Sequence, residues 1–214
     1  MRKIKFANNE YYHIFNRGVD KREVFLSEDD FLRFFQSMDE FNVPNPIGSI
    51  FENSFRKNKT VNNQIKKNKE SELVEFICYC LNPNHYHFIV KQVADNGIEK
   101  FMHKIGTGYT KYFNKKYNRS GSLFQGSFKA VHVESNEQLL HVSVYVNLNN
   151  KIHQLGSLAS KSSWGEYIKK NASNFCKKEI ILGQFNDNLE YKAFAEKFLK
   201  GIQKRKETEK FLLE

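Results

Sequence analysis

The chain has 214 residues, a length typical of one domain or of one domain with an extension. Its 34 Lys and Arg residues against 24 Asp and Glu give a formal net charge of +10, and 40% of the residues are hydrophobic. This composition excludes a disordered tail, and the basic balance favours a polyanionic partner. We expect a cytoplasmic protein, because no apolar run spans a membrane, no signal-peptide core is visible, and three cysteines do not form a disulfide framework.

The first half of the chain predicts a strand, a helix and a hairpin. Residues 10–16 are rich in strand-favouring aromatics. Ser27 and Asp30 have the spacing of a capping box, and the helix that they begin ends at the Asn- and Pro-rich stretch 42–46. The Lys- and Asn-rich stretch 43–70 reads as an insertion, either a solvated loop or a basic arm. Two strands, at 72–81 and 85–92, then flank the Asn-Pro-Asn turn.

The second half predicts a helix at 98–117, a strand at 124–134, a helix at 136–148 and a terminal helix from Leu189. The β-α-β-β-α-β order predicts an α+β, ferredoxin-like (split βαβ) fold, an antiparallel sheet with its helices on one face. The helix that follows carries Tyr145, and a helical tail is added to it. We therefore expect a catalytic domain over residues 1–158 and a helical extension over 159–214.

A pair of histidines begins the second hairpin strand. His85 and His87 are two residues apart, so their side chains point to the same face of a strand, where both imidazoles can contact one metal ion. Such pairs are also found as ordinary packed histidines.

A polar stripe runs along the helix predicted at 136–148. His141, Tyr145 and Asn149 are four residues apart among apolar neighbours. A tyrosine hydroxyl can attack a phosphodiester, and a divalent cation held by two imidazoles would stabilise the charge that develops on the phosphate. The amide oxygen of Asn149 is a candidate third ligand. The alternative is a packed tyrosine whose hydroxyl binds a carbonyl.

Basic and aromatic residues alternate between Lys100 and Ser120. Cations neutralise phosphates and aromatic rings stack on bases, so the segment favours nucleic-acid binding; the alternative is a helix with an aromatic core face and a solvated lysine face. The basic candidates in this segment include Lys104, Lys111, Lys115, Lys116 and Arg119.

Several motifs, in this order, resemble the single-tyrosine HUH transposase family, and within it the REP-associated tyrosine transposases and related insertion-sequence transposases. They are YHIFNRG, PNHYH, the stretch from YTKYFNKKY to GSFKAV, YVNLN and SSWGEY. The resemblance implies a ferredoxin-like enzyme that cuts and rejoins single-stranded DNA beside a hairpin. Tyr145 would be the nucleophile, forming a 5′-phosphotyrosine intermediate. His85, His87 and Asn149 would bind Mg²⁺ or Mn²⁺.

In this interpretation Arg17 and Lys129 extend the DNA-binding surface formed by the five basic candidates of the 100–120 segment. The expected partner is single-stranded or hairpin DNA and not a membrane. Related transposases often form homodimers, whereas the REP-associated branch can act as monomers. Two alternative hypotheses remain: a metal-dependent hydrolytic nuclease, and a non-catalytic nucleic-acid-binding module that stacks bases on Tyr12, Tyr79 or Phe88.

Overall fold

The computed structural model describes residues 4–50, 72–153, 160–169 and 174–212, with side chains up to residue 204. Most of the predicted insertion at 43–70, and the predicted domain boundary after residue 158, lie outside the described residues. The elements in chain order are β1 (Tyr11–Arg17), the 3-10 turn η1 (Val19–Lys21), α1 (Glu28–Glu40), β2 (Val74–Asn82), β3 (His85–Gln92), α3 (Gly97–Lys116), β4 (Lys129–His132), α4 (Asn136–Asn147), α5 (Asn149–Ile152), β5 (Lys161–Ser162), α6 (Trp164–Ile168), α7 (Glu179–Leu182) and α8 (Asn188–Leu212).

The strands form one antiparallel sheet in the order β4-β1-β3-β2-β5. The sequence β1-α1-β2-β3-α3-β4 confirms the predicted element order, and the predicted hairpin is β2-β3. β4 is shorter than predicted, because Gly126 has φ +66° and interrupts the extended run before Lys129. The predicted helical extension also contributes β5, which pairs with β2 at the sheet edge.

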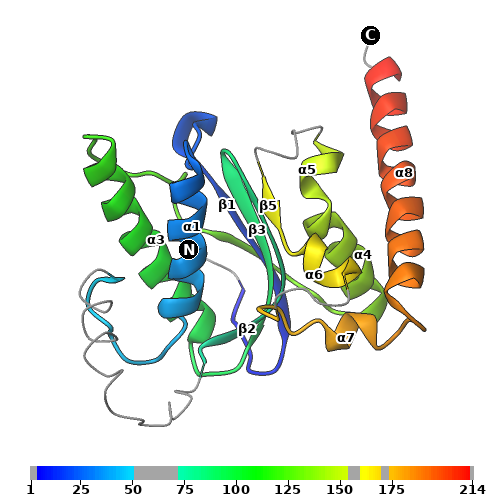
Figure 1. The fold of residues 1–214 in the computed structure, drawn as a ribbon, viewed down its shortest axis with the longest axis horizontal. Helices are drawn as coiled ribbons and strands as arrows, with labels where there is room; N and C mark the ends of the chain where they lie inside the picture. Colours follow the sequence, from blue (N-terminus) through cyan, green and yellow to red (C-terminus); the bar gives the residue numbers. More distant parts are fainter. Residues whose placement is uncertain (1–3, 51–71, 154–159, 170–173, 213–214) are drawn as a thin grey trace.

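Helices cover both faces of the sheet (Figure 1): the two helices of the split βαβ unit, α1 and α3, share one face as predicted, and the added helices cover the other face, which the sequence had left unassigned. On one face, α1 and α3 pack against sheet residues such as Ile14 and Phe88. On the other, α4, α6 and α8 pack against Ile77 and Ile89. The physical reason is the composition of the hairpin: β2 is buried at eight of its nine positions, so both of its faces need an apolar cover.

A β-bulge adjusts the hairpin to these two layers. The register of β2 against β3 shifts between Phe76 and Cys78. As a result, Ile77 and Cys78, which are consecutive, both belong to the layer beneath α4, while Phe76 and Tyr79 belong to the opposite layer.

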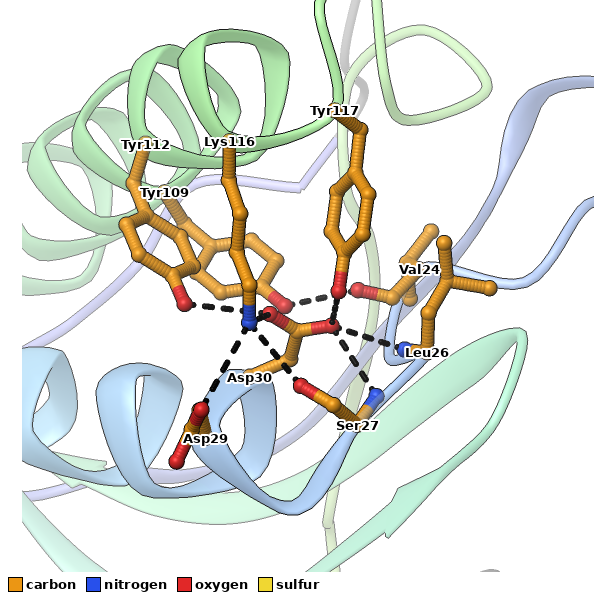
Figure 2. A network of polar contacts seen from close by, with 9 residues as sticks. All are labelled: Val24, Leu26, Ser27, Asp29, Asp30, Tyr109, Tyr112, Lys116 and Tyr117. Atoms are coloured by element: carbon orange, nitrogen blue, oxygen red, sulfur yellow. Dashed lines mark hydrogen bonds and ion pairs between the residues drawn. The ribbon is translucent and has the colours of Figure 1, made fainter.

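A buried carboxylate joins α1 to α3 (Figure 2). The Asp30 side chain is 0% exposed, and one of its oxygens accepts hydrogen bonds from the backbone N–H groups of Leu26 and Ser27 and from the Tyr117 hydroxyl. The other oxygen accepts from the Tyr112 hydroxyl at 3.1 Å and from the Lys116 ammonium at 2.8 Å. The predicted capping residue Asp30 therefore also connects the two helices that cover this face.

Candidate metal and nucleophile site

Three histidines lie on the face of the sheet opposite to α1 and α3. In β1, Tyr12 and Ile14 pack beneath α1 and α3, so His13 between them points the other way. The same alternation in β3 places His85 and His87 on that second face, and the register pairs Phe15 with His87. The two strands therefore place His13 beside His87, although 74 residues separate them in the chain.

Tyr145 on α4 meets these histidines within one chain. Its ring centroid lies 5.6 Å from that of His87 and 6.0 Å from that of His13, with both pairs edge to face. The ring centroids of His85 and His87 are 5.2 Å apart. The structure thus brings together the tyrosine and the two histidines that the sequence singled out.

Asn149 contacts the other histidine of the pair. Its Oδ1 lies 3.1 Å from His85 Nε2, and the Asn82 amide nitrogen lies 2.8 Å from that Oδ1 and 2.9 Å from Nε2. His85 Nδ1 is 2.6 Å from Asn84 Oδ1, which accepts the Nδ1 proton and leaves the lone pair on Nε2. Asn149 is fully buried, and its Nδ2 has no partner among the described residues. The His85 Nε2 lone pair and the Asn149 Oδ1 therefore both face the amide nitrogen of Asn82, which can donate one N–H to each.

The predicted polar stripe of His141, Tyr145 and Asn149 does not lie on one continuous helix. α4 stops at Asn147, Leu148 leaves helical geometry, and Asn149 begins α5. His141 stacks on Phe198 of α8 at 4.6 Å, away from the other two residues. Only Tyr145 and Asn149 of the stripe approach the histidine pair.

A buried polar network holds the end of α4 in place. The Ser163 hydroxyl donates to Asn147 Oδ1 at 2.6 Å, and Asn147 Nδ2 donates to the Tyr191 hydroxyl of α8 at 3.2 Å. Ser163 Oγ also accepts from the backbone N–H of Tyr79 in β2. The network links α4 to the sheet and to α8, and so fixes the helix that carries Tyr145.

Burial keeps the histidines neutral. It lowers the pKa of His13 to about 4. Burial, with the charges of the neighbouring histidines, holds the pKa of His87 well below its usual value. Burial also lowers the pKa of His85, against the opposing effect of its contact with Asn149. Neutral imidazoles are the form that binds metal ions.

A pocket of about 530 Å³ opens beside the histidine pair. Its lining joins His85 and His87 to three cations, Arg17, Lys21 and Lys129. A larger neighbouring pocket of about 1400 Å³ shares Lys129 and is also lined by Lys111. A phosphodiester entering the smaller pocket would meet positive charge as well as the imidazoles.

Three of the other basic candidates are engaged within the chain. Lys116 binds Asp30 (Figure 2), and Lys104 donates to the backbone carbonyls of 43–45. Arg119 donates to Asn114 and to the Ser122 carbonyl. Lys115 is exposed at the end of α3. Of the seven basic candidates, Arg17 and Lys129 are therefore the ones that line the histidine pocket.

Four residues of the site were not predicted: His13, Asn82, Asn84 and Lys21. His13 stands in the YHIFNRG motif, but only strand pairing reveals its contact with His87. The sequence predicts Asn82 and Asn84 only as turn residues. Lys21 has φ +59° in the turn after β1, and that conformation could not be read from the sequence.

The aromatic residues proposed as base-stacking platforms are not available on the surface. Tyr12, Tyr79 and Phe88 are all buried, under α1 and α3 or beside them. Tyr145, in contrast, is half-buried next to the histidines. This is the reverse of the arrangement that a sheet-stacking module would need.

Among the described residues, no three His, Cys, Asp or Glu side chains are grouped so that they could hold a metal ion. The amide oxygen of Asn149 is the candidate third protein ligand for a cation bound by His85 and His87. In the part of the chain that the structure describes, no helix has the length and apolarity to cross a bilayer.

Comparisons with known proteins show a similarity of fold and a family match. The solved structure of a REP-associated tyrosine transposase bound to a REP hairpin is similar in fold, with a TM-score of 0.52 and 10% identity, covering 82% of this chain and 88% of that one. The structure of tRNA(His) guanylyltransferase from Saccharomyces cerevisiae, with 14% identity, matches 89% of this chain and 79% of its own at a TM-score of only 0.33, too low to support an argument. No curated protein matches the sequence.

The model of the family described as "Transposase IS200 like" matches residues 48–149. This range contains β2, β3, α3, β4 and α4, and with them both histidines of the pair, Tyr145 and Asn149. Over residues 48–149 the chain is therefore similar to the IS200-like transposase family.

Proposed function

We propose that the protein cuts and rejoins single-stranded DNA through a covalent bond between DNA and Tyr145. The observation that supports this most strongly is the approach of the Tyr145 ring to His87, at 5.6 Å between centroids, within one chain. The five-stranded antiparallel sheet with its helices resembles the fold of the REP-associated transposase, which also supports the proposal.

In the proposed reaction the Tyr145 Oη attacks a backbone phosphorus and loses its proton to solvent. The phosphorus–O3′ bond breaks, and the departing 3′ oxygen takes up a proton. The 5′ phosphate stays on Tyr145, so a 3′ hydroxyl can later attack the phosphotyrosine and restore a phosphodiester. The energy of the bond is retained, and no nucleotide cofactor is needed for rejoining.

His85, His87 and Asn149 fit a divalent cation, either Mg²⁺ or Mn²⁺. The two imidazoles are held neutral by burial, and the Asn149 Oδ1 lies 3.1 Å from His85 Nε2. When bound, such a cation polarises the phosphate and stabilises its developing charge. The chain itself orients the ligands: Asn84 sets the His85 tautomer, and Asn82 fixes the amide of Asn149.

Arg17, Lys21 and Lys129 are proposed to hold the DNA backbone, because they line the pocket beside the histidines. Lys111 would extend this contact along the neighbouring pocket. A hairpin with a single-stranded flank is the proposed partner, since the similar solved structure holds a hairpin.

The test uses oligonucleotides labelled at the 3′ end that carry a hairpin with random single-stranded flanks, incubated with Mn²⁺. Cleavage through Tyr145 transfers the label to the protein, where a denaturing gel detects it. Tyr145→Phe should keep DNA binding and lose the adduct. Tyr112→Phe, a control on the opposite face of the sheet, should keep both.

A labelled adduct that persists in Tyr145→Phe would refute the nucleophile. Free 5′-phosphate ends in that variant would instead favour a hydrolytic nuclease. The double variant His85→Ala/His87→Ala should lose cleavage at every Mn²⁺ concentration; unchanged cleavage would show that the histidines are not the ligands.

A further inference from the structure

His13 contacts His87 through one ring nitrogen of each residue. His13 Nε2 lies 2.9 Å from His87 Nδ1, a hydrogen-bond distance. The two rings are nearly parallel, with centroids 5.1 Å apart and an interplanar angle of 21°. The neighbouring strands β1 and β3 set this contact, because both rings project from the same face of the paired backbones.

The contact requires one shared proton. Two lone pairs at 2.9 Å would repel, and so would two N–H groups, so one nitrogen donates and the other accepts. If His13 donates, the proton of neutral His87 is on Nε2. If His87 donates from Nδ1, its Nε2 keeps a lone pair. Only the second arrangement leaves His87 able to bind a cation, because Nδ1 is occupied by His13.

The surroundings hold His13 in a defined orientation. Its ring centroid lies 5.0 Å from that of Phe15 and 6.0 Å from that of Tyr145, with which it forms an edge-to-face pair. His87 is itself packed on Phe15, with centroids 5.5 Å apart. Neither imidazole can rotate freely while these aromatic contacts persist, so the shared proton has a fixed geometry.

We propose that His13 is a positioning residue that accepts the Nδ1 proton of His87 and thereby keeps the His87 Nε2 lone pair available to the cation. This inference rests on the proposed function, in which His87 is a ligand. His13 itself touches neither the metal nor the DNA in this scheme. It acts on His87 in the way that Asn84 acts on His85, so each ligand histidine has its own acceptor.

The experiment compares wild type with His13→Leu, which has no acceptor, and with His13→Gln, whose amide oxygen can accept. Long-range ¹⁵N–¹H NMR of the metal-free proteins reports the tautomer of His87, and calorimetry with Mn²⁺ alone reports the affinity. We expect His87 to be the Nδ1–H form in wild type and in His13→Gln. In His13→Leu the Nε2–H form should appear, and the Mn²⁺ affinity should fall about 10- to 100-fold.

His132→Leu is the matched control, because His132 is a histidine of the adjacent strand β4 that pairs with Glu10; it should change neither readout. An Nε2–H His87 in the wild-type protein would overturn the inference, and so would a His13→Leu variant with unchanged tautomer and affinity. Failure of the wild-type protein to bind Mn²⁺ would count against the proposed metal role, whereas the NMR result on metal-free protein tests the histidine pair separately. If His13→Leu does not fold, the wild-type and His13→Gln spectra still decide the tautomer.

Discussion

At the residue scale, buried polar side chains have different roles on the two faces of the sheet. Around His85 they orient the imidazole at the edge of a pocket. Around Asp30 every carboxylate oxygen is engaged by donors from α1, α3 and the segment before α1. The first arrangement can bind a ligand, and the second can only stabilise the fold.

Asp30→Asn should lower the free energy of unfolding by about 3 kcal/mol, since hydrogen bonds to a buried charge are lost or weakened. Urea denaturation measures the change. Asp29→Asn is the control: its side chain is 80% exposed and only 3.9 Å from Lys116, so its effect should stay within about 0.5 kcal/mol. Equal losses in the two variants would contradict the role assigned to Asp30.

The stability contributed by Asp30 should depend on pH. Burial alone would raise the pKa of Asp30, but hydrogen bonds from Lys116, Tyr117, Leu26 and Tyr112 outweigh it and lower the pKa below 3.8. The stability that Asp30 contributes is therefore complete above pH 3.8, the ordinary pKa of the group, and is lost as the pH falls through the lower pKa of the folded state. The difference between wild type and Asp30→Asn, measured by urea titration, should shrink in that range; a constant difference would refute this.

At the scale of the element, α4 has to be placed before Tyr145 can act. Ser135 caps its first turn by accepting from the backbone N–H of Gln138. At its other end Asn147 joins Ser163 and Tyr191, all of them buried. The helix is held by its neighbours α8 and β2, and this explains why the C-terminal extension matters to the site.

Tyr191→Phe should lower the free energy of unfolding by about 1–3 kcal/mol, because the buried side chains of Ser143 and Asn147 lose the hydroxyl that both contact. Thermal unfolding checks it. Lys192→Ala, one residue along the same helix, removes only an exposed i,i+4 pair with Glu196 and should change stability by about 0.5 kcal/mol or less. A Tyr191→Phe protein as stable as Lys192→Ala would argue against the network.

Considered as a whole molecule, the chain contains both halves of the candidate site. One sheet separates the layer of α1 and α3 from the layer of α4 and α8 (Figure 1), and Tyr145 meets His87 in the second layer. We therefore propose that cleavage occurs within one chain and needs no helix exchanged from a second copy. A monomer would then be sufficient for the reaction.

Mixing inactive variants tests this. Tyr145→Phe keeps the histidines and His87→Ala keeps the tyrosine, so a mixture would regain adduct formation only if the tyrosine of one chain entered the site of another. We expect no adduct above the sum of the separate variants. A recovered adduct, detected on the 3′-labelled oligonucleotide, would show that the helix is shared between chains.

The sequence by itself determined the order of elements, the capping box at Ser27, the common face of His85 and His87, and the family to which the motifs pointed. These features depend on neighbours a few residues apart, where periodicity and turn chemistry act. Strand register and packing decided the rest: His13 beside His87, Lys21 beside the pocket, Lys116 bound to Asp30, and helices on both faces of the sheet. Contacts between residues 60 to 90 positions apart follow from how the strands pair and the helices pack, and no local pattern in the chain encodes them.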